Sequence, residues 1–185
     1  MKKSIFHNLI ALVPAVLVLF GLSFGLKGVA AANAEEDYLK KMQILMPGSE
    51  TFVEEPYAGE DANIRAVYKG DTGFVIETAT RGYADEIVML IGVSNDGEVI
   101  GLTVLNMHET FGLGGKSLKD WKFLAQFLLT SGNTAVRGSD SDAEVFVDSI
   151  TGATVTSKAI VRCVNSAAAY VTGADVGSGA TSWGG

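Results

Sequence analysis

Apolar and polar residues follow different patterns along the chain, and each pattern predicts a kind of element. Leu9 to Leu26 is a run of 18 residues without a charge. At about 1.5 Å per residue a helix over this run covers roughly 27 Å, close to the thickness of the hydrocarbon layer of a membrane. Apolar, β-rich runs at 72–80, 85–93 and 98–106 predict strands. Asp96-Gly97 joins the last two runs and predicts a tight hairpin turn.

Three further segments have helical periodicity. Residues 35–48 predict a short amphipathic helix that stops at Pro47-Gly48. Residues 117–129 predict a second helix, whose apolar face consists of Leu118, Trp121, Leu124, Ala125 and Leu128. A third helix is predicted after Thr154, with one face made of Thr156, Ile160, Cys163, Val164, Ala167 and Val171.

A short strand is predicted at 144–147, whereas residues 49–70 and 131–143 are rich in turn-forming residues and predict irregular chain. The fold class that follows is α+β: a mainly antiparallel sheet with flanking helices, preceded by one N-terminal transmembrane helix. We expect a membrane anchor at 1–34, an exported domain at 35–173 and a flexible Gly/Ser-rich tail at 174–185.

A cleaved signal peptide is the alternative interpretation of the N-terminal run, because a small-residue sequence, AAANA, follows it. The apolar core of a signal peptide has about 7–15 residues. The run here is longer and Lys27 flanks it, which favours an uncleaved anchor. Lys2 and Lys3 then keep the N-terminus in the cytoplasm, so that the C-terminal domain is extracytoplasmic.

Charge is distributed unevenly between these parts. All 21 acidic residues follow position 34, whereas Lys2, Lys3 and Lys27 precede it; the exported part therefore has 21 acidic and 14 − 3 = 11 basic residues, a net charge of −10. Proteins that bind nucleic acid carry a basic face, so nucleic acid is excluded as a partner. Cys163 is the single cysteine, which excludes an internal disulfide, and its spacing from Ile160 and Ala167 indicates a buried apolar role.

The sequence DSITGATVTSK, residues 148–158, stands between the short strand and the last helix. This position predicts a strand-to-helix turn in which Thr154 lies near the first free backbone N–H groups of the helix. Such groups, together with the helix dipole, form a site for an anion, above all phosphate. Gly152 and Ala153 have small side chains and permit close approach. Ordinary helix capping by Ser or Thr and an ordinary glycine turn explain the same residues.

A second glycine-rich stretch, which ends in Gly115-Lys116-Ser117, resembles the end of a phosphate-binding P-loop. A P-loop requires a glycine five residues before the Gly-Lys pair, and that position is Thr110. The departure argues against a nucleotide triphosphatase. No metal site is expected either, because the only histidine besides His108 is His7 in the predicted anchor.

The two loops together resemble the FMN-binding domain family. DSITGATVTS is similar to the family's flavinylation motif, which is Asp, two residues, Ser or Thr, Gly, Ala and Thr, and it fits at Asp148, Thr151, Gly152, Ala153 and Thr154. Residues 82–116 are similar to the segment that these proteins carry upstream, which ends in a His-x-Glu-Thr-Pro-Gly-Leu-Gly-like loop. The loop departs twice, because His108 directly precedes Glu109 and Phe111 replaces the proline.

The resemblance implies that FMN is attached covalently to Thr154 through a phosphoester, and that a separate flavin transferase attaches it. Asp148 and Thr151 would be recognised by the transferase and shape the turn. The other expected cofactor-binding residues are Gly152, Ala153 and Thr156 and, on an opposite wall formed by the upstream loop, Glu109, Thr110, Gly112, Leu113 and Gly114.

Within the family the chain resembles the G subunits of Rnf-type electron-transport complexes, which have one membrane helix followed by an exported domain. The resemblance implies an electron-carrier subunit, not catalytic alone, of a ferredoxin:NAD oxidoreductase coupled to sodium or proton transport. Its partners would be the other membrane subunits, the flavin transferase and the lipid bilayer. Two alternatives stay open: a C subunit of a sodium-pumping NADH:quinone oxidoreductase, and a stand-alone flavinylated module for extracytoplasmic electron transfer.

Overall fold

The structure, a computed structural model, describes residues 33–107, 121–139 and 141–174. The chain divides into two compact units, residues 1–40 and 41–185. In the first unit the described residues are helical and carry an exposed ion pair of 2.6 Å between Lys40 and Glu36. None of the described helices is long and apolar enough to cross a membrane. Residues 1–32 of the predicted anchor lie outside the described residues.

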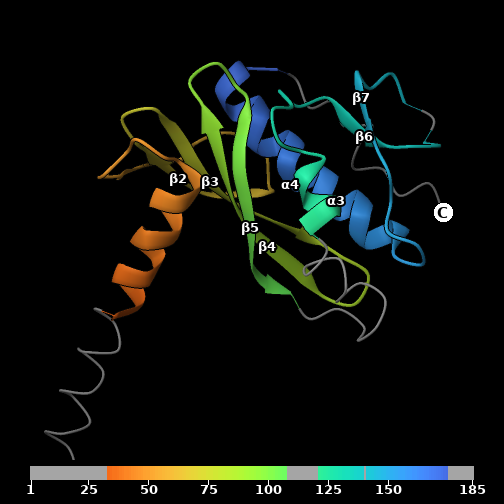
Figure 1. Cartoon of the computed structure of the whole chain (residues 1–185), viewed down its shortest axis with the longest axis horizontal. Helices are drawn as coiled ribbons and strands as arrows, with labels where there is room; N and C mark the ends of the chain where they lie inside the picture. Colours follow the sequence, from red (N-terminus) through yellow and green to blue (C-terminus); the bar gives the residue numbers. More distant parts are fainter. Residues whose placement is uncertain (1–32, 108–120, 140, 175–185) are drawn as a thin grey trace, which may run out of the picture. The chain divides into compact units, whose positions relative to one another are not determined.

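A five-stranded antiparallel sheet forms the centre of the second unit, and each strand pairs with the next one along the chain (Figure 1). Its strands are β1 (Val53–Glu55), β2 (Ile64–Lys69), β3 (Gly73–Arg81), β4 (Glu86–Ser94) and β5 (Val99–Met107). The three predicted strands are confirmed as β3, β4 and β5. Gly97 has a φ of 88° in the β4–β5 turn, which confirms the hairpin predicted from Asp96-Gly97.

The prediction of irregular chain at 49–70 is wrong for β1 and β2. Ile64 and Val67 of β2 are buried against the sheet's core, and the strand pairs along its length with β3. Pro56 and the glycines around β2 masked a strand of six residues. Burial against a neighbouring strand stabilises it, and a local pattern does not report such burial.

A second, two-stranded sheet pairs β6 (Thr134–Val136) with β7 (Val145–Val147) in parallel. The strand predicted at 144–147 is confirmed as β7, whereas the prediction of a loop at 131–143 is wrong for β6. Asn165 explains why a strand forms there. Its buried side chain accepts a hydrogen bond from the Thr134 N–H (3.1 Å) and donates one to the Thr134 carbonyl (2.9 Å), which fixes the strand on the helix behind it.

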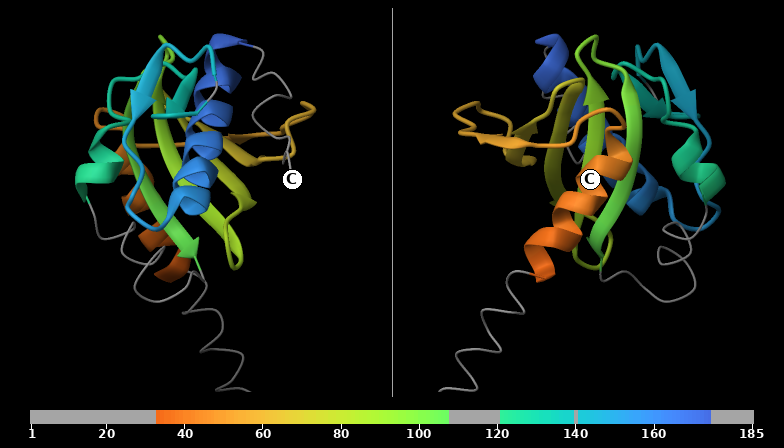
Figure 2. Two further views of the ribbon diagram at one scale, coloured as in Figure 1. Left: turned by 90° about the vertical axis from the view of Figure 1, so that its right-hand side faces the viewer. Right: turned by 60° about the vertical axis from the view of Figure 1, so that its left-hand side comes forward.

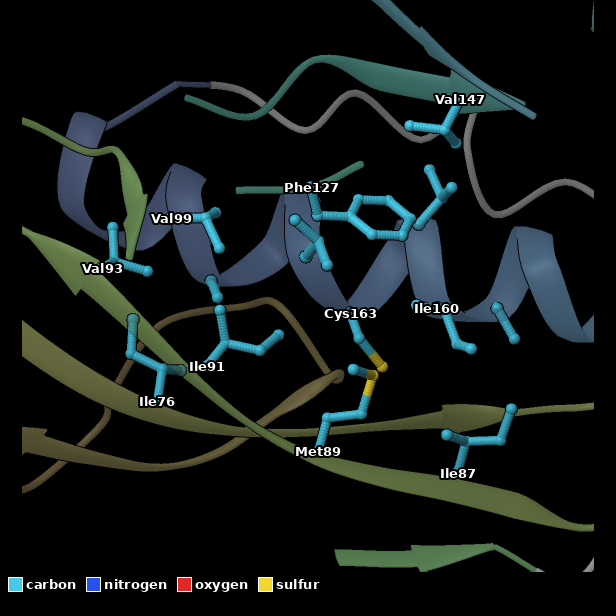
Figure 3. Packing of buried hydrophobic residues seen from close by; sticks show 14 of the residues in the cluster. Ile76, Ile87, Met89, Ile91, Val93, Val99, Phe127, Val147, Ile160 and Cys163 are labelled. Carbon is cyan, nitrogen blue, oxygen red and sulfur yellow. The ribbon is translucent and has the colours of Figure 1, made fainter. Parts of the chain in front are cut away.

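Helix α4 (Thr154–Thr172) covers one face of the five-stranded sheet, and β6, β7 and α3 (Trp121–Ala125) lie beside it (Figure 2). Alternate residues of β4 point at α4 and form the core with it, together with Phe127 (Figure 3). Within this core the Cys163 and Met89 side chains point toward one another (Figure 3). The core residues drawn there from the sheet are Ile76, Ile87, Met89, Ile91, Val93 and Val99.

Helix α3 ends earlier than predicted and buries a different face; residues 117–120 of the predicted helix, Leu118 among them, lie outside the described residues. Trp121 and Leu128, placed on the apolar face by periodicity, are 71% and 44% exposed. Phe123 and Phe127 are buried instead, and their rings pack edge to face with centroids 5.3 Å apart. The helix ends at Ala125 and the following residues form turns, with Leu129 at a φ of 61°, so helical spacing does not continue to Leu128.

A helix at 33–45 confirms the amphipathic helix predicted at 35–48, and Gly48 follows it with a φ of 98°. In the second unit, Leu45 lies against Gly92 and Gly101, which are paired across β4 and β5. A Cβ added at Gly92 would lie 2.4 Å from the Leu45 carbonyl oxygen. Because β4 side chains alternate between faces, this contact is on the sheet face opposite α4. The glycine pair therefore permits close backbone packing there.

Candidate functional site

The turn between β7 and α4 is formed by residues 148–153, as the sequence predicts. The Ala153 N–H donates to the Ile150 carbonyl over 2.9 Å, which closes a four-residue turn. Gly152 occupies the third position of this turn with a φ of 78°. A positive φ at the third position is typical of a type II turn and favours glycine. Gly152 is therefore required by the backbone, whatever else it does.

Thr154 is the first residue of α4, and Ala153 before it is the N-cap residue. Ala153 has no side chain that caps the helix. The first backbone hydrogen bond of the helix runs from the Ser157 N–H to the Ala153 carbonyl (2.9 Å). The N–H groups that begin the helix before Ser157 therefore have no carbonyl acceptor within it. Thr154 is exposed, and within the described part of the chain its hydroxyl has no hydrogen-bond partner. Ordinary capping therefore does not explain this threonine.

Charges around Thr154 suit an anion. The first turn of α4 contains no acidic residue. Asp148 is the carboxylate closest to Thr154 in the sequence, and its Oδ1 is paired with the Arg137 Nε at 2.7 Å. Lys158 lies one helical turn after Thr154 and is exposed. A phosphate ester on the Thr154 oxygen would thus lie at the N–H groups that begin a helix of 19 residues, at the positive end of its dipole.

The turn displays the other motif residues in different ways. Asp148, Thr151 and Gly152 are exposed, whereas Ala153 is buried. Thr156 is 1% exposed and points into the fold. Direct contact between Thr156 and a cofactor stays a prediction. Asp148, Thr151, Gly152 and Thr154 are thus all exposed on the same short segment of chain.

Helix α4 has a defined direction along the sheet. Its last residue, Thr172, lies against Gly97 in the β4–β5 turn. Arg162 reaches the other end of the sheet, where it donates to the Arg81 carbonyl (2.9 Å) at the end of β3. Thr154 precedes Arg162 by eight residues, or roughly 12 Å of helix, so it lies toward the end of the sheet at which Ile87 pairs with Met107.

Met107 is the last described residue before the second candidate loop. Glu109, Thr110, Gly112, Leu113 and Gly114 lie outside the described residues, so their contacts with a cofactor stay a prediction. Met107, which precedes them at the end of β5, nevertheless lies at the end of the sheet toward which Thr154 lies.

Residues 82–169 match the model of a family described as FMN-binding domain. These residues form an FMN-binding domain. The domain includes β4, β5, α3, both strands of the small sheet and most of α4. The site fits the phosphate end of FMN, because it has small neighbours, a helix N-terminus without acidic residues and a hydroxyl that bonds to none of the described residues.

Curated relatives extend the similarity to named complexes. The G subunit of the Na(+)-translocating ferredoxin:NAD(+) oxidoreductase complex of Acetobacterium woodii is 37% identical over 97 residues, which cover 50% of this chain and 46% of the relative. The G subunit of the proton-translocating ferredoxin:NAD(+) oxidoreductase complex of Clostridium ljungdahlii is 33% identical over 109 residues, 58% of each chain. The chain thus spans about half the length of the curated relatives it matches.

Among solved structures, the C subunit of the Na(+)-translocating NADH-quinone reductase of Parabacteroides distasonis is similar over part of the chain. The superposition has a TM-score of 0.46 with 19% identity, and it covers 57% of this chain and 61% of the other.

Three residues that shape the FMN-binding domain at this turn were not predicted from the sequence. Gln126 holds the backbone of Asp148: its Oε1 accepts from the Asp148 N–H (2.7 Å) and its Nε2 donates to the Asp148 carbonyl (3.3 Å). Arg137 pairs with the Asp148 carboxylate. Ser157 bonds to the turn from inside α4. Gln126 and Arg137 are 22 and 11 residues from Asp148, too distant for any local motif.

Cys163 lies in the core of the domain, far from solvent, as predicted. Burial raises the pKa of its thiol to about 11. A thiol with so high a pKa is neutral and unreactive at physiological pH. Among the described residues, no three His, Cys, Asp or Glu side chains gather in a way that would hold a metal ion.

Proposed function

We propose that this chain is the flavoprotein subunit of an Rnf-type, ion-translocating ferredoxin:NAD oxidoreductase, and that it carries FMN on Thr154 through a phosphoester. The observation that carries the proposal is the exposed, unpartnered Thr154 hydroxyl at the start of α4, within a sequence that fits the flavinylation motif. The FMN-binding domain and the two G-subunit relatives support the assignment to this class of complex.

The ester joins the Thr154 oxygen to the phosphorus of FMN, with the net loss of one water between protein and FMN. The residual negative charge on the phosphate is stabilised by the N–H groups that begin α4 and by its dipole. Gly152 and Ala153 leave room for the phosphate beside the backbone. When bound, FMN supplies the electron-transfer chemistry. The chain contributes the tether, the orientation of the cofactor and the charges around it.

Asp148 and Thr151 are the residues that a flavin transferase would recognise. Both are exposed on the turn. Arg137 and Gln126 keep Asp148 in a fixed position, so a transferase meets an ordered surface and not a flexible segment. The loop that contains Glu109, Thr110, Gly112, Leu113 and Gly114 forms the opposite wall of the flavin site. This placement is supported by the position of Met107 at the end of β5.

The proposed location is the cell membrane, with residues 1–34 as an anchor and the FMN-binding domain outside the cytoplasm. A covalent tether suits this location, because a dissociated flavin would be lost from the cell. The other subunits of the complex are the redox partners. Affinity purification from gently solubilised membranes of the native host should recover those subunits with the chain. Purification of the chain without any other membrane protein of the complex would contradict membership.

Attachment is tested by co-expression with a flavin transferase in a host that exports the chain. The parent chain should give a fluorescent flavin band in a denaturing gel, and Thr154→Ala should give none. Because the Thr154 hydroxyl makes no hydrogen bond to the described residues, Thr154→Ala should change the free energy of unfolding by less than about 0.5 kcal/mol. A fluorescent band that survives Thr154→Ala in a folded protein would reject the attachment site.

A further inference from the structure

Ser157 holds the turn that presents Thr154. Its side chain is buried, and its hydroxyl makes one hydrogen bond to each end of the turn at 150–153. The oxygen accepts from the Ile150 N–H at 3.1 Å, and the hydroxyl donates to the Ala153 carbonyl at 2.9 Å. Ile150 and Ala153 are the first and last residues of the type II turn. A single buried hydroxyl therefore joins both ends of the turn to the first turn of α4.

One of these bonds is common and the other is not. A helical serine often donates to the carbonyl four residues earlier, as Ser157 does to Ala153. The bond from the Ile150 N–H spans seven residues and reaches outside the helix. It is this bond that ties the turn to α4, because it fixes the chain before Gly152 relative to the helix after it. Thr154 lies between the two fixed points.

We propose that Ser157 is a positioning residue for flavin attachment: it fixes the turn at 150–153, so that the Thr154 hydroxyl is presented to the transferase in one orientation. The inference rests on the proposed attachment of FMN to Thr154. In that reaction the Thr154 oxygen forms a bond to the phosphorus of an activated flavin nucleotide. The bond from that phosphorus to the donor's leaving group breaks at the same time, and the leaving group takes up the proton that the Thr154 hydroxyl gives up.

The turn has a second, independent restraint at its other end. Gln126 binds both the N–H and the carbonyl of Asp148, through its own amide. Neither bond involves Ser157. Loss of the Ser157 hydroxyl therefore leaves the Asp148 recognition residue in place and loosens only the part of the turn next to Thr154. Binding by the transferase should persist, whereas the geometry of attack should suffer. Small misplacements of reacting atoms reduce rates by as much as about 100-fold.

Ser157→Ala should accordingly lower the kcat of flavin transfer by about 10-fold or more and leave the KM for the chain nearly unchanged. The assay uses the full-length chain in detergent, purified transferase and its flavin donor, with in-gel flavin fluorescence as the readout of transfer. Amide hydrogen exchange provides a readout without flavin: the Ile150 N–H should exchange faster in Ser157→Ala, because it has lost its acceptor.

Ser166→Ala is the matched control. Ser166 is a buried serine of the same helix, nine residues further on, and its hydroxyl oxygen accepts one hydrogen bond, from the Asn63 Nδ2 at 3.1 Å. It should lower the melting temperature to a similar degree without changing kcat or the exchange of the Ile150 N–H. Ser157→Thr keeps the hydroxyl and adds a methyl group in the core; it should lower the melting temperature but retain most of kcat.

The possible outcomes separate this inference from the proposed function. Transfer to the parent chain that is abolished by Thr154→Ala supports the attachment site. Given that result, parent-like kcat in Ser157→Ala, or equal losses in Ser157→Ala and Ser166→Ala, overturns the positioning role. If Ser157→Ala does not fold, the kcat of Ser157→Thr is compared with that of the parent. A loss of kcat in this folded variant, which keeps the hydroxyl, overturns the proposal. A parent chain that accepts no flavin rejects the proposed function itself.

Discussion

Substitution of Gly152 by alanine perturbs the turn at its most constrained backbone position. Gly152 has a φ of 78°, in the left-handed region. An L-residue with a Cβ atom adopts this region at a cost of about 1–2 kcal/mol. That cost lowers the ratio of folded to unfolded protein by roughly 5- to 30-fold. For a chain of this size it corresponds to a fall in Tm of about 2–8 °C, at 2–4 °C per kcal/mol.

The alternative for Gly152→Ala is a change of turn type, which would place φ in the negative region and rotate the peptide groups next to Thr154. Either response disfavours the geometry in which the Thr154 hydroxyl is presented. We therefore expect Gly152→Ala both to lower the Tm and to slow flavin attachment. Thermal unfolding followed by circular dichroism measures the first effect, and the time course of in-gel flavin fluorescence measures the second.

Gly173→Ala is the control for the cost in stability alone. Gly173 ends α4 with a φ of 67°, and a Cβ added there would meet no atom within 4 Å. Alanine at this position would impose the same kind of backbone strain as Gly152→Ala, but at the opposite end of the helix. Both variants should lose similar stability, but only Gly152→Ala should load flavin slowly. If Gly152→Ala loads at the parent rate despite its lower Tm, the turn geometry does not govern attachment and the reasoning is refuted.

Three other predictions concern the domain around the site. Burial raises the pKa of the Cys163 thiol from 9.0 to about 11, so the thiol ionises at lower pH in the unfolded chain than in the folded one. The parent should therefore lose about 2 kcal/mol of stability as pH rises from 9 to 11, and urea titrations of Cys163→Ala should not show this loss. Gly92→Ala places a Cβ 2.4 Å from the Leu45 carbonyl oxygen and should cost about 1–3 kcal/mol in urea unfolding; parent-like stability would contradict the close packing. Arg137 and Asp148 form an exposed pair, with side chains 66% and 71% exposed, so Arg137→Gln should cost at most about 1 kcal/mol; a larger loss would contradict a surface pair.

The fold could be predicted where local pattern and tertiary packing agree. The strands β3, β4 and β5 combine apolar alternation with a glycine hairpin, and the sequence predicts all three. β6 could not be predicted, because it depends on the side chain of Asn165, 31 residues away from Thr134. The helix at 117–129 was assigned the wrong face, because Trp121 fits the period but is exposed, and Phe123 and Phe127 fill the core.

The candidate site divides in the same way. The position of Thr154 at a helix start follows from the motif and from the strand and helix that flank it. The hydrogen bonds that fix the turn do not follow, because Gln126 comes from another part of the chain and Ser157 is an ordinary polar residue within a helical period. Local sequence predicts where the turn is, and only the packed domain reveals what holds it.

The measurement that tests the central claim most directly is the mass of the tryptic fragment that contains Thr154. Trypsin cuts after Arg137 and Lys158, so one fragment, residues 138–158, contains the whole motif. In the chain co-expressed with a flavin transferase, this fragment should gain the mass of one FMN less one water, and fragmentation should place the added mass on Thr154. Thr154→Ala should remove it. An added mass on Thr151 or Thr156, or flavin that is released when the protein is denatured, would contradict the account.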